Sequence, residues 1–374
     1  MLVFGTRPEA IKMAPLIDAL KQYPNEFEVL VCITAQHREM LDQVLSIFKI
    51  QPDIDLNLMK VGQDLPSLFA AVLSGMHTVL LQHRPDMVLV HGDTSTTLAT
   101  AMAAFFNGTP IGHVEAGLRT YRIAEPFPEE FNRQVVSKIA RWNFAPTEGN
   151  RQNLLDEGFA DASIAVTGNT VTDALFWVLQ KIDSDRGLKK EISGFLSNVL
   201  NFNFDRQRFV LITGHRRENF GIGIEQICAA IQELAKQYPI IQFVYPVHLN
   251  PHIQEPVKEL LSKLENVHLI EPLNYTNFTY LMSKCYLVLT DSGGIQEEAP
   301  SLGKPVLVMR DVSERPEAIT AGSVRLIGAR KEAIISAVSE LLDDEAVYQS
   351  MAKAINPYGD GRACERIIAA LRLT

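Results

Sequence analysis

The stretch Leu289-Thr290-Asp291-Ser292-Gly293-Gly294-Ile295-Gln296-Glu297-Glu298 has the pattern of a strand that turns directly into a helix. The apolar residues before Asp291 predict a buried strand, and Ser-Gly-Gly predicts a tight turn at its carboxyl end. Backbone amides in such a turn can point at a diphosphate, and Glu298 is placed where a carboxylate can accept from ribose hydroxyls. The alternative is a turn whose glycines serve packing only. We favour the nucleotide-binding interpretation.

The same alternation of short apolar runs and amphipathic helices extends in both directions from this stretch. Strands of the second half are predicted at Phe209–Thr213, Ile241–Tyr245, Val267–Ile270, Tyr286–Thr290, Pro305–Met309 and Val324–Ile327. Strands of the first half are predicted at residues 1–5, Val29–Ile33, Met87–His91, Ile111–Glu115 and Ile164–Thr167. Such βαβ alternation predicts parallel sheets covered by helices on both faces.

The chain, at 374 residues, is too long for one ordinary core, so we expect two Rossmann-like doubly wound α/β domains facing a central cleft. We place the first at residues 1–169 and the second at 170–357. The final segment, 358–374, is predicted to pack back on the first domain as a helix. Residues 183–208, between the two series of strands, are polar and irregular in period, and we place the domain hinge near residue 170.

The composition of the chain argues against several classes of function. A net charge of -9 disfavours a general nucleic-acid role, because phosphate backbones attract basic surfaces. The four cysteines are scattered, which argues against a zinc site and a disulfide framework, and Cys32 and Cys285 are expected as buried free thiols. No apolar stretch approaches the roughly 20 residues that span a bilayer. The first residues predict a strand instead of a signal peptide, so we expect a cytoplasmic protein without a membrane partner.

The first strand leads into Gly5-Thr6-Arg7-Pro8-Glu9-Ala10-Ile11-Lys12. Glycine permits a tight turn, and proline suits a first helical turn. Arg7 and Lys12 then stand near a helix N-terminus, which favours an anion. Two ordinary surface cations are an equally good interpretation of position alone.

Carboxylates end or follow the next strands of this half. Asp93 lies in His91-Gly92-Asp93-Thr94-Ser95-Thr96-Thr97, and Glu115 follows Gly112-His113-Val114. Glu129 begins a helix in which it could pair with Arg133. Helix capping is the alternative for Asp93, but it does not explain an acid beside a glycine at the predicted cleft edge, so we favour a functional role. A surface ion pair explains Glu129 taken alone. Together, however, three acids on one side of a domain raise one another's pKa and can act as general acid or base.

Histidines and missing motifs complete the residue-level analysis. His113 is expected to be a satisfied core histidine, whereas His215 follows a strand of the second half and is a candidate for proton transfer or phosphate contact. The chain has neither GxGxxG after its first strand nor GxxxxGK[ST], so nicotinamide and P-loop interpretations lose support.

Taken together, these motifs resemble the non-hydrolysing UDP-N-acetylglucosamine 2-epimerases along essentially the whole chain. The segments that carry the resemblance are FGTRPEAIKMAPL (4–16), TAQHREMLDQVL (34–45), HGDTSTTLA (91–99), HVEAGLRT (113–120), PFPEEFNR (126–133), GNTVTDAL (168–175), TGHRREN (213–219), YPVHLNP (245–251) and TDSGGIQEEAPSLGKPVL (290–307).

The resemblance implies a glycosyltransferase-B-like fold, a homodimer, and UDP held mainly by the second domain. On the nucleotide it implies Ser292, Gly293, Gly294, Glu298, Arg315, Leu273 and Phe278. Around the phosphates and the sugar it implies Arg7, Lys12, Asp93, Glu115, Glu129 and His215. It also implies a second, activating UDP-GlcNAc near Gln36, His37 and His248.

The implied reaction interconverts UDP-GlcNAc and UDP-ManNAc without metal or cofactor and supplies ManNAc-type precursors for cell-surface polysaccharide. The C2 proton is removed while UDP leaves C1, and UDP adds back after reprotonation on the other face. The residues leave open which of Asp93, Glu115 and Glu129 is base and which is acid. Two other functions stay open: a glycosyltransferase on the same fold, and a non-catalytic UDP-sugar sensor.

Overall fold

The computed structural model describes residues 1–34, 38–58, 62–214, 216, 219–313 and 315–373. The chain divides into two compact units. Unit 1 comprises Met1–Trp177 with Tyr358–Thr374, and unit 2 comprises Val178–Pro357. The division falls within one helix, α7 (Thr170–Ser184), whose first residue is the predicted start of the second domain.

Unit 1 contains a parallel sheet in the order β3-β2-β1-β4-β5-β6-β7. Its strands are β1 (Leu2–Phe4), β2 (Val31–Ile33), β3 (Ile54–Asp55), β4 (Val88–His91), β5 (Ile111–Val114), β6 (Trp142–Ala145) and β7 (Ile164–Val166). The order reverses between β1 and β4, and this is the switch point beside which ligands bind in doubly wound sheets. The sequence pattern missed β3 and β6.

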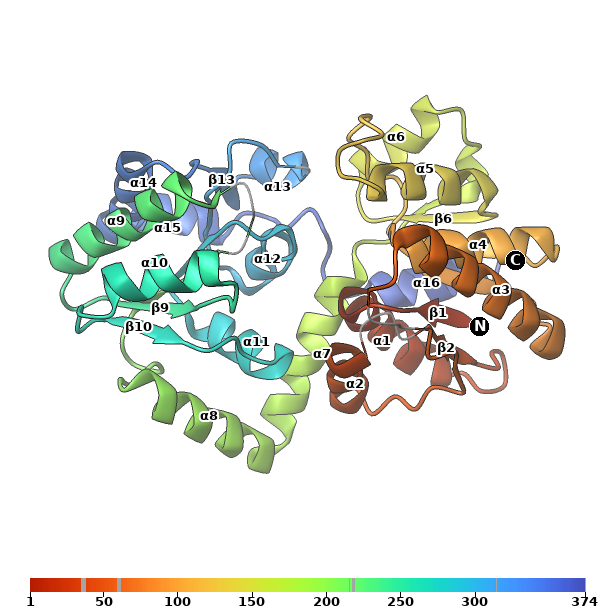
Figure 1. The fold of residues 1–374 in the computed structure, drawn as a ribbon, viewed down its shortest axis with the longest axis horizontal. Coiled ribbons are helices and arrows are strands. Elements are labelled where there is room, and N and C mark those ends of the chain that lie inside the picture. The colour runs from red at the N-terminus through yellow and green to blue at the C-terminus, as the bar shows by residue number, and fades with distance from the viewer. Residues whose placement is uncertain (35–37, 59–61, 215, 217–218, 314, 374) are drawn as a thin grey trace. The chain divides into compact units, whose positions relative to one another are not determined.

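Helices cover both faces of this sheet. They are α1 (Arg7–Lys21), α2 (Arg38–Ile47), α3 (Leu65–His83), α4 (Ser95–Phe106), α5 (Glu129–Ile139) and α6 (Glu148–Asp156), with the first half of α7. The chain returns to unit 1 at its end, where α16 (Ala363–Leu371) lies beside α1 (Figure 1). The carboxylate of Asp173 accepts from the backbone amides of Ala363 and Cys364, at 3.1 and 2.9 Å, and so caps α16.

Unit 2 repeats the architecture with a parallel sheet in the order β10-β9-β8-β11-β12-β13. Its strands are β8 (Phe209–Thr213), β9 (Gln242–Pro246), β10 (Val267–Ile270), β11 (Leu287–Thr290), β12 (Val306–Val308) and β13 (Val324–Leu326). Its helices are α8 (Arg186–Leu200), α9 (Ile222–Gln237), α10 (Pro251–Leu261), α11 (Tyr275–Lys284), α12 (Gly293–Glu298), α13 (Pro316–Ala321), α14 (Lys331–Asp343) and α15 (Glu345–Ala352). The predicted doubly wound fold is confirmed in both units.

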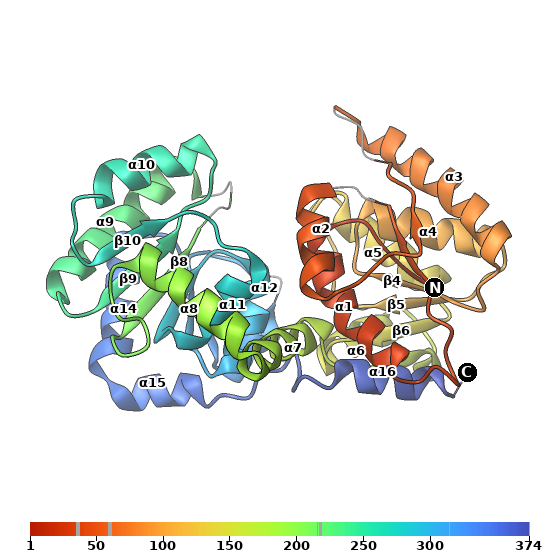
Figure 2. The same cartoon turned by 90° about the horizontal axis from the view of Figure 1, so that it is seen from below.

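Two expectations about helices were wrong. Residues 183–208 are not irregular, because α8 occupies most of them and buries Ile192, Leu196 and Leu200 at four-residue spacing. The chain also contains a helix that is long and apolar enough to cross a bilayer by composition, namely α3. This helix follows β3 and precedes β4 of one sheet, packs along α4 (Figure 2), and buries residues such as Val72 and Met76.

Candidate active site

Two of the three predicted acids of unit 1, Asp93 and Glu115, follow neighbouring strands of its sheet, whereas Glu129 begins α5. β4 and β5 pair in register, with His91 opposite Val114, so Gly92 and Glu115 are the next residues along each strand. The amide of Gly92 donates to the carbonyl of Val114 at 2.9 Å, which continues the pairing to this edge. β1 pairs with β4 on its other side, and the loop after β1 therefore reaches the same edge.

Glu115 is held by groups from two distant segments. It adopts the left-handed backbone conformation, with φ of 66°, which is uncommon for a residue with a side chain. Its Oε2 accepts from Nζ of Lys12 and, at 2.7 Å, from Nδ2 of Asn169. The structure therefore brings together two residues that the sequence assigned to one site, Lys12 and Glu115.

Two buried histidines, His91 and His113, lie in the strands β4 and β5 that precede these carboxylates. Burial lowers the pKa of His91 to about 4, and its Nε2 lies 3.6 Å from Oε2 of Glu115. His113 is fully buried; its Nε2 donates to the carbonyl of Gly92 at 2.7 Å, and burial lowers its pKa to about 3. Both imidazoles are thus neutral at physiological pH. The prediction that His113 is a satisfied core histidine is confirmed.

Asp93 is paired with an arginine of α5. Nη2 of Arg133 donates to Oδ2 of Asp93 at 2.5 Å, and the Asp93 side chain is 26% exposed. Burial raises the pKa of Asp93 to about 6; Arg133 opposes the rise, whereas Glu115 and Glu129 reinforce it. The repulsion predicted between the three acids is therefore present, and Asp93 titrates close to neutrality.

The simpler interpretations of Asp93 and Glu129 were wrong. The N-cap of α4 is Thr94, whose hydroxyl accepts from the amide of Thr97 at 3.1 Å, so Asp93 does not cap the helix. Arg133 pairs with Asp93 and, at 3.4 Å, with Glu130, and among the ion pairs of the described residues there is none between Arg133 and Glu129.

The predicted nucleotide residues of unit 2 surround the turn after β11. The N-cap of α12 is Ser292, and Gly293 and Gly294 begin the helix. The guanidinium of Arg315 lies against Gly293, and its Nε donates to Oε1 of the buried Glu297 at 2.7 Å. The structure thus brings Arg315 to the glycine turn, although the two are separated by β12.

The remaining predicted residues of unit 2 lie around this turn or apart from it. The buried Glu298 accepts at Oε1 from the hydroxyl of Tyr275, at 3.0 Å. Phe278 is half-buried on the same helix as Tyr275, and Leu273 is half-buried just before that helix. His248 is exposed, and its Nδ1 accepts from the amide of Asn250.

Three predicted residues lie outside the described part of the chain: Gln36, His37 and His215. Two described residues that follow His215 in the sequence, Arg216 and Asn219, contact Asp291. Oδ2 of Asp291 accepts from the amide of Arg216 at 2.9 Å and from Nδ2 of Asn219 at 3.1 Å. Arg7, the first residue of α1, is half-buried.

Sequence reasoning missed several residues that hold the predicted ones. Asn169 contacts Glu115, Asp291 accepts from the amide of Arg216, and Glu9 joins the loops after β1 and β4. Only Glu9 left a sequence signal, because a glutamate three residues after Thr6 is a capping-box pattern. The other two depend on partners far away in the chain.

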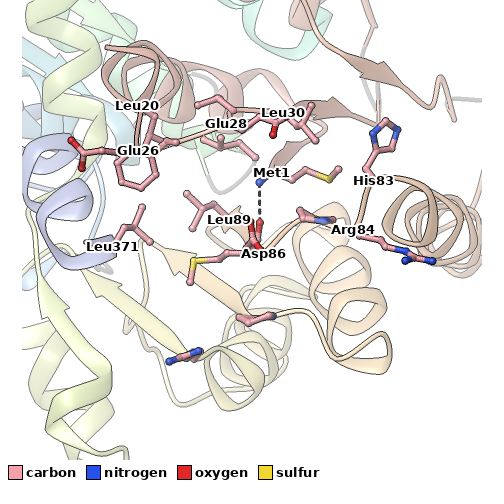
Figure 3. Close-up of a pocket in the computed structure, with 17 residues that line it drawn as sticks. Met1, Leu20, Glu26, Glu28, Leu30, His83, Arg84, Asp86, Leu89 and Leu371 are labelled. Carbon is pink, nitrogen blue, oxygen red and sulfur yellow. Dashed lines mark hydrogen bonds between the residues drawn. The ribbon is translucent and has the colours of Figure 1, made fainter. Parts of the chain in front are cut away.

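A cavity of about 530 Å³ lies elsewhere in unit 1, at the amino ends of β1 and β4 (Figure 3). Met1, Arg84, Asp86 and Leu371 are among the residues that line it, and none of the predicted site residues does. Within the described residues, no group of three His, Cys, Asp or Glu side chains is placed to hold a metal ion.

Comparisons with known proteins decide the family. The family profile described as UDP-N-acetylglucosamine 2-epimerase matches residues 18–372. The chain belongs to this family. A UDP-N-acetylglucosamine 2-epimerase of Escherichia coli (strain K12) is 55% identical over 374 residues, covering 100% of this chain and 98% of that protein.

Solved structures of UDP-GlcNAc 2-epimerases share the fold. The crystal structure of the Neisseria meningitidis enzyme bound to UDP-GlcNAc is 51% identical, with a TM-score of 0.91, and covers 100% of this chain and 99% of that one. The Methanocaldococcus jannaschii enzyme, in complex with UDP-GlcNAc and UDP, is 33% identical with a TM-score of 0.81, at 100% and 99% coverage. The glycosyltransferase-B-like fold expected from the sequence is thereby confirmed.

Proposed function

We propose that the protein is a non-hydrolysing UDP-N-acetylglucosamine 2-epimerase, which interconverts UDP-GlcNAc and UDP-ManNAc. The observation that carries this proposal is full-length likeness, at 51% identity, to an enzyme whose crystal structure holds UDP-GlcNAc. The cluster of Lys12, Glu115, Asp93 and Arg133 at one edge of the unit 1 sheet supports it, because the reaction needs acid and base groups at the sugar.

Each unit has its own role in this proposal. Unit 2 binds UDP, with Ser292, Gly293, Gly294 and Arg315 at the diphosphate and Glu298 at the ribose; Leu273 and Phe278 lie beside the uracil. Arg315 supports this assignment, because its guanidinium is fixed by Glu297 beside the glycine turn. An arginine so placed stabilises negative charge that develops on a departing diphosphate.

Unit 1 acts on the sugar, with Asp93, Glu115 and Glu129 as the acid–base groups and with Arg7 and Lys12. His215, which belongs to the sequence of unit 2, is assigned to proton transfer or phosphate contact. The C2–H bond and the bond from C1 to the diphosphate oxygen break, which gives a C1=C2 double bond and free UDP. Addition of UDP to C1 and of a proton to the opposite face of C2 completes the epimerisation. The ion pairs of Asp93 and Glu115 support these roles, because they fix both carboxylates before substrate binds.

A glycosyltransferase remains the second candidate, since it would use the same nucleotide turn. It would require an acceptor and would leave UDP-GlcNAc unchanged in its absence. A sensor would bind the nucleotide sugar without turning it over. Incubation of the purified protein with UDP-GlcNAc alone, followed by chromatography, separates these functions. Formation of UDP-ManNAc supports the epimerase, free sugar with UDP indicates a hydrolase, and unchanged substrate contradicts the proposal.

We further propose that two copies of the chain associate through α3 and α4. The end of α4 exposes Phe105 by 56% and Phe106 by 66%, and α3 exposes Leu81 by 53%. Exposed apolar side chains gathered on two neighbouring helices are typical of protein–protein interfaces. Light scattering should give the mass of a dimer for the wild type and that of a monomer for a Phe105→Glu, Phe106→Glu variant. A monomeric wild type contradicts the proposal.

We place the reaction in the cytoplasm. The four cysteines of the protein are buried free thiols, as expected for Cys32 and Cys285. Free thiols are typical of proteins in a reducing compartment. The product would supply ManNAc-type precursors for cell-surface polysaccharide. Cell fractionation with an antibody against the chain tests the location, and recovery in a membrane or secreted fraction contradicts it.

An activating UDP-GlcNAc site near Gln36, His37 and His248 completes the proposal. It is supported by the Methanocaldococcus jannaschii structure, which contains both UDP-GlcNAc and UDP. The reverse reaction, from UDP-ManNAc, should then accelerate when a trace of UDP-GlcNAc is added. A rate that is unaffected by UDP-GlcNAc contradicts the activator site.

A further inference from the structure

Glu9 is a buried carboxylate that the proposed reaction does not use. It is the third residue of α1 and is 2% exposed. Its Oε2 accepts from the amide of Thr6 at 2.8 Å, from the hydroxyl of Thr6 at 2.7 Å and from the amide of Gly5 at 3.1 Å. These contacts form a capping box, which stabilises the start of a helix with one carboxylate oxygen.

The other carboxylate oxygen of Glu9 accepts hydrogen bonds from a different segment, the loop after β4 and the start of α4. Its Oε1 accepts from the hydroxyl of Thr94 at 2.6 Å and from the hydroxyl of Thr97 at 3.0 Å. Thr97 also contacts the end of β4, where its hydroxyl lies 2.6 Å from the carbonyl oxygen of His91. A capping box does not require any of these contacts, which cross 85 residues of sequence between Glu9 and Thr94.

The two segments that Glu9 joins carry the predicted site residues of unit 1. Arg7 directly follows Thr6 and begins the helix that carries Lys12, whereas Asp93 directly precedes Thr94. We propose that Glu9 is a positioning residue that fixes the loop after β1 against the loop after β4, and thereby sets Arg7 and Lys12 relative to Asp93.

The physical basis is the strength and the direction of these bonds. Hydrogen bonds to a carboxylate group are stronger than bonds between two neutral groups, and here each oxygen accepts from a different loop. Removal of the carboxylate takes the shared acceptor away from the buried amide of Gly5 and from the half-buried Thr6 and Thr94, so both loops can shift. A displacement of about 1 Å at a site that depends on orientation can cost about 100-fold in rate.

This inference rests on the proposed epimerase function, and kinetics of three variants test it. Glu9→Ala should lower kcat by about tenfold or more per folded molecule while UDP affinity stays within about twofold, because UDP is assigned to unit 2. Glu9→Gln keeps the shape and an acceptor oxygen, and should restore most of that loss. Glu9→Ala combined with Thr94→Val should be no slower than Glu9→Ala alone.

A cap outside the site provides the matched control. Asp64 caps α3 in the same unit by accepting from the amide of Ser67 at 2.8 Å. Asp64→Ala should lower the melting temperature and leave kcat per folded molecule unchanged. If Glu9→Ala behaves like Asp64→Ala, Glu9 is a helix cap only and the inference is overturned.

A second pair keeps the test decisive if Glu9→Ala does not fold. Thr94→Ser retains the hydroxyl that contacts Glu9, whereas Thr94→Val removes it. The inference predicts that Thr94→Ser keeps kcat and Thr94→Val loses about tenfold, and equal kcat values overturn it. An active wild type with unaffected variants refutes only the role of Glu9, whereas an inactive wild type refutes the proposed function as well.

Discussion

A Cβ atom added to Gly293 would lie 2.6 Å from Nη1 of Arg315 and 2.9 Å from its Cζ. Real Cβ atoms do not approach other heavy atoms so closely, so a side chain at this position would require the guanidinium, the end of a flexible side chain, to move away. Arg315 also forms an ion pair with Glu297, in which its Nε lies 2.7 Å from Oε1. The glycine turn and the arginine therefore form one unit of structure, although the sequence presents them as separate motifs.

Gly293→Ala should therefore displace Arg315 and weaken UDP binding. A hydrogen bond to a charged group contributes about 1.5–3 kcal/mol, so we expect the Kd for UDP to rise about tenfold or more. Isothermal titration calorimetry measures this. In an Arg315→Ala background the same glycine substitution should cost clearly less, since the guanidinium is gone. Equal costs in both backgrounds would mean that the added methyl group acts on the ligand directly.

Glu298→Ala should weaken UDP binding by a comparable factor, because the variant loses an acceptor for the ribose hydroxyls. The control is Tyr275→Phe, which removes the hydroxyl that donates to Oε1 of Glu298 at 3.0 Å and keeps the carboxylate. That variant should bind UDP nearly as tightly as the wild type. The ribose assignment is wrong if Glu298→Ala binds UDP normally by calorimetry.

The amide variants Asp93→Asn, Glu115→Gln and Glu129→Gln should each lower turnover and leave UDP binding largely intact. The acids act on the sugar carbon, whereas UDP is assigned to the other unit. Loss of an interaction made only in the transition state lowers kcat and kcat/KM together. Steady-state rates should be measured beside thermal melts. A reduced melting temperature with normal C2 proton exchange in all three variants contradicts the catalytic assignment.

The pH dependence of the rate should report on Asp93. Its pKa rises from 3.8 to about 6 on folding, mainly through burial, so at pH 7.5 the carboxylate is ionised beside Arg133. We expect kcat/KM to fall as the pH drops through about 6, and this limb to be absent from the residual activity of Asp93→Asn. Loss of activity as the pH rises through 6 would show that the protonated form is required instead.

The same shift has a consequence for stability. A group whose pKa is higher in the folded state than in the unfolded state stabilises the fold at low pH. The contribution of Asp93 to the free energy of unfolding should therefore decline as the pH rises from about 4 to about 6. Urea titrations of the wild type and Asp93→Asn across this range measure the difference.

Most strands could be predicted from the sequence because buried parallel strands are continuous apolar runs. β6 was missed because Asn143 interrupts its run, and β3 because it has only the residues Ile54 and Asp55. The helix at 186–200 was missed although Ile192, Leu196 and Leu200 have helical spacing, since the polar residues between them dominate the segment.

The sequence predicts which site residues lie close together only where those residues directly follow strands. Asp93 and Glu115 could be assigned to one edge because they follow neighbouring parallel strands. Their partners could not, because the sequence offers Arg133 three acids, Asp93, Glu129 and Glu130. The structure pairs it with Asp93 and Glu130. Contacts such as that between Asn169 and Glu115 depend on how distant segments pack, which no local pattern encodes.

The most direct test of the account is proton exchange at C2. The purified protein is incubated with UDP-GlcNAc in deuterated water, and the sugars are examined by NMR and mass spectrometry. The account predicts UDP-ManNAc that carries deuterium at C2, and a gradual loss of the C2 proton from the UDP-GlcNAc that remains. UDP-ManNAc that retains the original C2 proton, or UDP-GlcNAc that is neither exchanged nor converted, would contradict it.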